Sequence, residues 1–87
     1  MIVPKQFLVR QTTFGEYVQR TFGSRDQLSE SFRNHLARRE AELQSLQKPG
    51  DELWEWDMGG WDELCGRSGL AIVRDGQVIK SSMMLLS

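Results

Sequence analysis

Apolar residues recur at helical spacing through much of the first half of the chain. Ser24 is followed three positions later by Gln27, which is the pattern of a capping box at a helix start. Pro49 and Gly50 interrupt the pattern. The spacing therefore predicts one long helix over about 24–47. Its apolar stripe is formed by Leu28, Phe32, Leu36, Leu43 and Leu46.

A shorter helix is predicted directly before it, over about 13–22. Thr13 and Glu16 form a second capping box, and Gly23 suits the left-handed turn that ends a helix. The apolar face of this helix is formed by Phe14, Val18 and Phe22. Ahead of it, residues 5–10 fit either an edge strand or a helical turn opened by a proline, and the sequence does not decide between them.

The spacing of apolar residues changes to every second position in the C-terminal half. Alternation over residues 51–58 predicts a half-buried strand, with Trp54 and Trp56 on the inward face. The outward face, which we expect to be wet, is made by Asp51, Leu53, Glu55 and Asp57. Residues 61–65 fit a single helical turn that follows two glycines.

A β-hairpin is predicted near the end of the chain. Asp75 and Gly76 stand between two alternating apolar runs, which is the strongest short-range hairpin signal. A two-residue turn pairs Arg74 with Gln77, and the next predicted pairs are Val73 with Val78 and Ile72 with Ile79. We expect one face to lie on the long helix, namely Leu70, Ile72, Ile79, Met83 and Leu85. The other face holds Ala71, Val73, Val78, Lys80, Ser82 and Met84.

Together these elements predict an α+β fold. The N-terminal helices pack on a C-terminal antiparallel meander of three strands, or of four if residues 5–10 form a strand. The length of 87 residues supports a single domain over residues 1–87. A domain this small buries only about 60–65% of the surface of its unfolded chain, and a homodimer is a common way to add burial.

The composition is typical of a folded, water-soluble domain. The chain is 39% hydrophobic and 26% charged, with a formal net charge of −1. No apolar run approaches the roughly 20 residues of a membrane span, and the N-terminus lacks the apolar core of a signal peptide. One cysteine, Cys65, fits a reducing compartment. We therefore expect a cytoplasmic protein that does not act at a membrane.

Charge is unevenly distributed between the two halves. Residues 1–48 carry eight basic and five acidic side chains, whereas residues 49–87 carry three basic and seven acidic side chains. Attraction between the halves within one fold is favoured over an acidic surface for a partner, because surface charge acts mainly on association.

The segment 51–69 holds the candidate chemistry. Tryptophan beside carboxylates can bind cations or sugars, and Arg67 could lower the pKa of the Cys65 thiol. Glu55 and Asp57 would lie about 7 Å apart on one strand face. The candidate ligand-binding residues are Trp61, Cys65, Arg67, Glu55 and Asp57. A structural role is favoured for Cys65 and for the turn at Arg67, and a solvated strand face is favoured for the two carboxylates. Trp61 lies outside the alternation, so its role is left open.

The predicted long helix carries a cluster of basic residues. Arg33, His35, Arg38 and Arg39 could face a phosphate backbone. However, acidic residues lie between them, Arg38 and Glu42 fit an i,i+4 ion pair, and the net charge is negative. Nucleic acid is therefore a disfavoured partner.

The last strand is apolar on both faces, which suggests that its outer face is covered. Either residues 1–12 or a second copy of the chain could cover it. The interface candidates are Met84, Leu86, Val73 and Val78.

No metal-ligand set, nucleotide loop or catalytic triad is present in the sequence, so we expect no cofactor. The favoured hypothesis is a non-catalytic interaction or regulatory module that self-associates. The alternatives are a small-ligand binder or minor enzyme that uses segment 51–69 and, third, a weak nucleic-acid binder.

Overall fold

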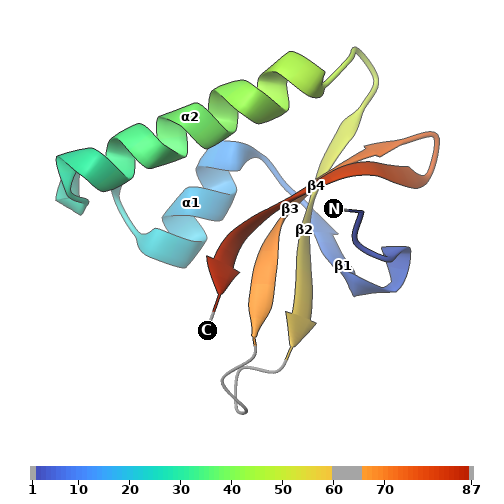
Figure 1. Ribbon diagram of the computed structural model, residues 1–87, viewed down its shortest axis with the longest axis horizontal. Helices are drawn as coiled ribbons and strands as arrows, with labels where there is room; N and C mark the ends of the chain where they lie inside the picture. The colour runs from blue at the N-terminus through green and yellow to red at the C-terminus, as the bar shows by residue number, and fades with distance from the viewer. Residues whose placement is uncertain (1, 60–65, 87) are drawn as a thin grey trace.

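A computed structural model describes residues 2–59 and 66–86 (Figure 1). Four strands form one antiparallel sheet in the order β1-β2-β3-β4, and the two helices follow β1 in the chain. The predicted α+β fold with helices on an antiparallel meander is confirmed. The elements are η1 (Lys5–Phe7), β1 (Leu8–Gln11), α1 (Phe14–Phe22), η2 (Arg25–Gln27), α2 (Glu30–Leu46), β2 (Glu52–Gly59), β3 (Arg67–Arg74) and β4 (Gln77–Leu86).

The N-terminal segment contains both of the structures that the sequence allowed. Pro4 precedes the short 3-10 turn η1, and the chain then extends into β1 at Leu8. Strand β1 pairs with β2 at the edge of the sheet, so the sheet has four strands rather than three.

Helix α1 begins and ends where the capping pattern predicted. The Thr13 hydroxyl accepts a hydrogen bond from the Glu16 backbone N–H at 3.1 Å. At the other end, Gly23 has a φ of 85° and donates its N–H to the Gln19 carbonyl at 3.0 Å. A glycine adopts this left-handed conformation without steric cost, so the helix ends here.

Helix α2 is shorter than predicted, because it begins at Glu30 rather than near Ser24. The Ser29 hydroxyl accepts from the Phe32 N–H at 3.3 Å, whereas the Ser24 side chain makes no capping hydrogen bond. Between them, Leu28 is extended, with φ −89° and ψ 153°, and packs against the core on the helix side of the sheet. The 17-residue helix ends at Leu46.

The sheet has a core on each face. The helix-side core is formed by Phe14, Tyr17, Val18, Leu36, Leu43, Leu53, Leu70 and Ile72. The opposite-side core is formed by Val3, Trp56 and Ala71, with Leu8, Met58 and Val78 packed against it. The Val3 N–H donates to the Ser81 hydroxyl at 2.8 Å, which holds the N-terminal segment against the strands. Figure 1 shows α1 and α2 lying together, with the segment before β1 lying beside the strands.

Strand β2 contradicts the prediction of one wet face and one buried face. Leu53, expected on the wet face, belongs to the helix-side core. Trp56 is fully buried on the other side and donates its indole N–H to the Leu70 carbonyl at 3.1 Å. Trp54 is only half-buried and donates its indole N–H to Glu52 at 3.0 Å. Both faces of this strand are covered, because helices lie on one and the N-terminal segment on the other.

The hairpin turn is confirmed, but the predicted register holds only next to it. Asp75 and Gly76 both have positive φ, and the two nearest predicted pairs are formed. Beyond them, Ile72 pairs with Lys80 instead of Ile79, because β4 has a bulge there and a second one farther along.

The bulges in β4 change which methionine faces the helices. Met84 packs against the helix-side core, whereas Met83 lies opposite Gly69 and remains 39% exposed. The predicted faces of these two residues were therefore wrong. An extra residue in one strand shifts every following side chain to the other face of the sheet.

Candidate functional site

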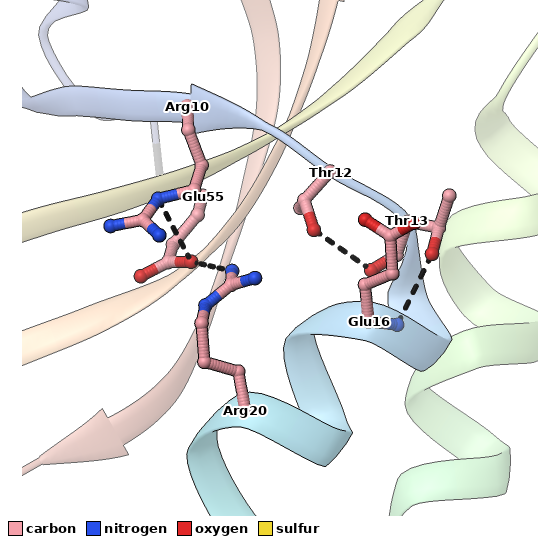
Figure 2. A network of polar contacts seen from close by, with 6 residues as sticks. All are labelled: Arg10, Thr12, Thr13, Glu16, Arg20 and Glu55. Atoms are coloured by element: carbon pink, nitrogen blue, oxygen red, sulfur yellow. Dashed lines mark hydrogen bonds and ion pairs between the residues drawn. The ribbon is translucent and has the colours of Figure 1, made fainter.

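Glu55 lies between two arginines from different elements (Figure 2). Arg20 of α1 donates to Glu55 Oε1, and the Arg10 Nε of β1 lies 4.0 Å from the same oxygen. The Glu55 side chain is only 15% exposed. This carboxylate ties β2 to both β1 and α1, and it joins acidic charge of the C-terminal half to basic charge of the N-terminal half, as the charge distribution suggested.

Asp57 has a different environment from Glu55. Its Oδ1 accepts a hydrogen bond from the Gly59 backbone N–H at 2.7 Å, at the end of β2. Glu55 forms ion pairs with arginines, whereas Asp57 accepts a hydrogen bond from the backbone. Each contact ties a carboxylate of β2 to a neighbouring part of the chain, and a ligand-binding role for the two residues stays a prediction.

Tyr17 places a phenol close to this charged group. Burial raises the pKa of the Tyr17 hydroxyl, and the negative charge of Glu55 contributes to the increase. Ser68, Thr21 and Arg20 lower the pKa in part. Among the described residues, the Tyr17 hydroxyl nevertheless forms no hydrogen bond of good geometry.

Of the other three predicted ligand-binding residues, the structure describes only Arg67. Trp61 and Cys65 fall within 60–65, outside the described residues. Arg67 is exposed at the start of β3, where it pairs with Gly59 and Leu86. A ligand site formed by these residues stays a prediction.

Three of the predicted interface residues are covered within the chain itself. Val73 is buried, Val78 packs against the opposite-side core, and Met84 packs against the helix-side core. Leu86 pairs with Arg67 at the end of the hairpin. The N-terminal segment, which is one of the two covers that the sequence allowed, packs on the outer face through Val3.

A small apolar surface remains next to the covering segment. Ile2 is 57% exposed and precedes Val3, whose N–H binds Ser81. Met83 lies two residues beyond Ser81 on the same sheet face, and Met58 is a half-buried neighbour of the opposite-side core. We call Ile2, Met58 and Met83 the methionine patch. Sequence reasoning missed it, because the alternation assigned Met83 to the helix side.

The basic cluster of α2 contains its own acidic partner. Arg39 lies 3.5 Å from Glu42 in an i,i+3 pair, in place of the predicted pair with Arg38. The His35 ring stacks on Phe32, with centroids 6.1 Å apart. Glu42 also lines the shallow hollow of about 230 Å³ beside these bases. A carboxylate at this position weakens attraction for a phosphate backbone.

A search for metal-binding groups and comparisons with known proteins do not point to one of the three proposed functions. Across residues 2–59 and 66–86, no three His, Cys, Asp or Glu side chains are grouped to hold a metal ion. No helix in this part of the chain is long and apolar enough to cross a membrane. No protein-family model, curated protein or solved structure matches the chain. The surface of the molecule is therefore the basis for a functional proposal.

Proposed function

We propose that this chain is a non-catalytic interaction module that forms a homodimer through the methionine patch. The observation that carries the proposal is the exposure of Ile2 and Met83, which lie one residue from Val3 and two residues from Ser81, the hydrogen-bonded pair that holds the covering segment on the sheet. Packing a second copy there removes these apolar side chains from water, which is favourable. Methionine also adapts its shape to a partner surface, because its side chain is unbranched and flexible.

The charges favour a second copy as the partner. A twofold interface brings the same surface patch of both copies together, so a charged patch would face its own charge. Ile2, Met58 and Met83 carry no charge, and the formal net charge of the chain is only −1. The patch itself therefore places no like charges against each other, and the low net charge keeps long-range repulsion small.

The sheet edges are less suited to this role than the sheet face. The outer strand β4 has two bulges and places Lys80 in its middle. The other outer strand, β1, has a bulge next to Arg10. Bulges and charged residues are the features by which proteins prevent pairing between exposed edges. A dimer formed face to face avoids them.

The experiment is a measurement of molecular mass by light scattering during size-exclusion chromatography. We expect the wild type to be a dimer at high micromolar concentration and the Met83→Glu variant to be a monomer. Leu46→Glu is the matched control, because Leu46 is 44% exposed at the end of α2, outside the patch. A monomeric wild type, or a Met83→Glu variant of unchanged mass, would contradict the proposal.

A further inference from the structure

A cleft on the helix side of the sheet has the size for a small molecule. It lies where the start of α1, the second half of α2 and the start of β2 meet. One side chain of the helix-side core reaches it from each element, namely Phe14, Leu43 and Leu53, and these form an apolar floor. The cavity volume is about 370 Å³, within the roughly 300–1,000 Å³ of ligand pockets.

The wall formed by α2 carries two neutral amides. Gln44 and Gln47 line the cleft together with Glu40 and Leu43. Residues three and four positions apart lie on one face of a helix, and Leu43 turns this face toward the core. Gln47 donates from Nε2 to the Asp51 backbone carbonyl at 3.4 Å, which uses only one of its amide hydrogens. The two amides therefore offer both donors and acceptors beside the apolar floor.

The carboxylates on the cleft side of the sheet are already compensated. Arg74 binds Asp51 through two hydrogen bonds of 2.8 Å, and the Asp51 side chain is only 2% exposed. Arg25 lies 3.5 Å from Glu40. Because each carboxylate has a basic partner, the cleft offers no unpaired charge to a cation, and the carboxylates disfavour an anion.

Glu52 also belongs to the lining, but its carboxylate is directed elsewhere. It accepts a hydrogen bond from the indole N–H of Trp54 at 3.0 Å. Neighbouring residues of a strand point to opposite faces, and Leu53, which stands between these two, belongs to the helix-side core. The Glu52 and Trp54 side chains therefore lie on the face away from the cleft, and the Glu52 charge is not a cleft feature.

We propose that this cleft binds a small neutral molecule in which an aromatic ring carries a carboxamide group. The ring lies on the apolar floor, because this contact removes apolar surface from water. The carboxamide exchanges hydrogen bonds with the glutamine amides, since each group has donors and an acceptor. A charged group of the same shape loses hydration without gaining an unpaired opposite charge, so it binds less tightly. The cleft and the methionine patch lie on opposite sides of the sheet, so this inference does not depend on dimerisation.

The first test uses three probes that share one ring and differ in charge, namely benzamide, benzylamine and benzoate. Each is titrated at neutral pH into the isotope-labelled protein while backbone amide resonances are recorded. We expect benzamide to cause saturable shifts at Thr13, Gly15 and Leu53 in the millimolar range, because so small a ligand makes few contacts. Benzylamine and benzoate should bind at least about threefold less tightly. No saturable shift with benzamide, or equal or tighter binding of a charged probe at these amides, would overturn the proposal.

The second test removes one amide from the wall. Gln44 is exposed, so Gln44→Ala should leave the fold intact and weaken benzamide binding by about twofold to tenfold, the effect of losing one neutral hydrogen bond. Gln19→Ala is the matched control, because it removes an exposed amide from α1 outside the cleft lining and should bind as the wild type does. Dispersed amide spectra show that both variants are folded. Unchanged affinity in Gln44→Ala, or an equal loss in both variants, would contradict the proposal.

Discussion

The Glu55 side chain lies in a different environment from the one that the strand pattern predicted. Alternation assigned it to the wet face with Asp57, as half of a candidate carboxylate pair. In the structure it is mostly buried between Arg10 and Arg20. Residue type and spacing did indicate a carboxylate on β2, but its partners come from β1 and α1. Such contacts depend on tertiary packing, which no local pattern contains.

The chain has a single tyrosine, which allows this charged group to be measured directly. Because burial and the charge of Glu55 raise the pKa of Tyr17 above its ordinary 10.0, replacing Glu55 by glutamine should lower that pKa. The raised pKa also means that folding favours the protonated phenol. The stability that it contributes is present below pH 10 and is lost as the pH rises through the pKa of the folded state.

Phenolate absorbance recorded against pH measures the titration of Tyr17. We expect the wild type to titrate above the ordinary value and Glu55→Gln to titrate at lower pH than the wild type. Glu16→Gln on the exposed side of α1 is the control and should titrate as the wild type does. A Glu55→Gln variant with a higher pKa than the wild type would show that this account of Glu55 is wrong.

Among the elements, α1 was predicted well and the start of α2 was not. Thr13 and Gly23 flank α1, and of the two neighbouring threonines only Thr13 has a glutamate three positions later, so the local signal was sufficient. Before α2 there are two candidate caps, Ser24 and Ser29. The capping box favoured the first, but Leu28 must be extended for its side chain to reach the helix-side core, and the helix can begin only after it. Packing therefore selected the second serine.

The two serines make a matched pair for mutation. Ser29→Ala removes the hydroxyl that accepts from the Phe32 N–H, and it should lower the free energy of unfolding by about 1 kcal/mol. Ser24→Ala removes a hydroxyl that makes no capping hydrogen bond, so we expect a change within about 0.5 kcal/mol. Urea unfolding followed by circular dichroism compares them. A larger loss at Ser24 would place the start of α2 where the sequence pattern put it.

Strand β4 shows the limit of prediction for a hairpin. The turn at Asp75 and Gly76 sets the register only for its nearest neighbours, because each bulge adds one unpaired residue. Nothing in the residue types around Ile79 and Met84 indicates a bulge. The strands themselves were predicted, but the face that each methionine occupies, and with it the methionine patch, could be found only from the structure.

For the whole molecule, Asp51 joins the turn that follows α2 to the end of β3. Its carboxylate receives two hydrogen bonds from Arg74 at the end of β3 and one from the Lys48 N–H in the turn after α2. The side chain is only 2% exposed. The Arg74 hydrogen bonds, followed by the Lys48 backbone hydrogen bond, lower the pKa of Asp51 to about 2.

This contact should determine part of the response to acid. Because the pKa of Asp51 is lower in the folded state than the ordinary 3.8, its stabilising effect is present above pH 3.8 and is lost as the pH falls toward about 2. Asp51→Asn should reduce the melting temperature at neutral pH and make it less dependent on pH in that window. Calorimetry at several pH values measures both effects.

The control for this experiment is Asp26→Asn, which changes an exposed carboxylate in η2. That variant should keep the acid dependence of the wild type. If Asp51→Asn lost stability below pH 4 as steeply as the wild type does, other carboxylates would be responsible for the acid response.

The hydrogen bond between Val3 and Ser81 also has a consequence for the order in which the molecule can be built. The two residues are 78 positions apart, and the Trp56 side chain that Val3 covers is also made long after it. At a synthesis rate of about 5–20 residues per second, Val3 leaves the ribosome's catalytic centre roughly 4–16 s before its partner exists. The part of the chain that is synthesised first is thus among the last to find its place, and until then one face of the sheet is available to chaperones.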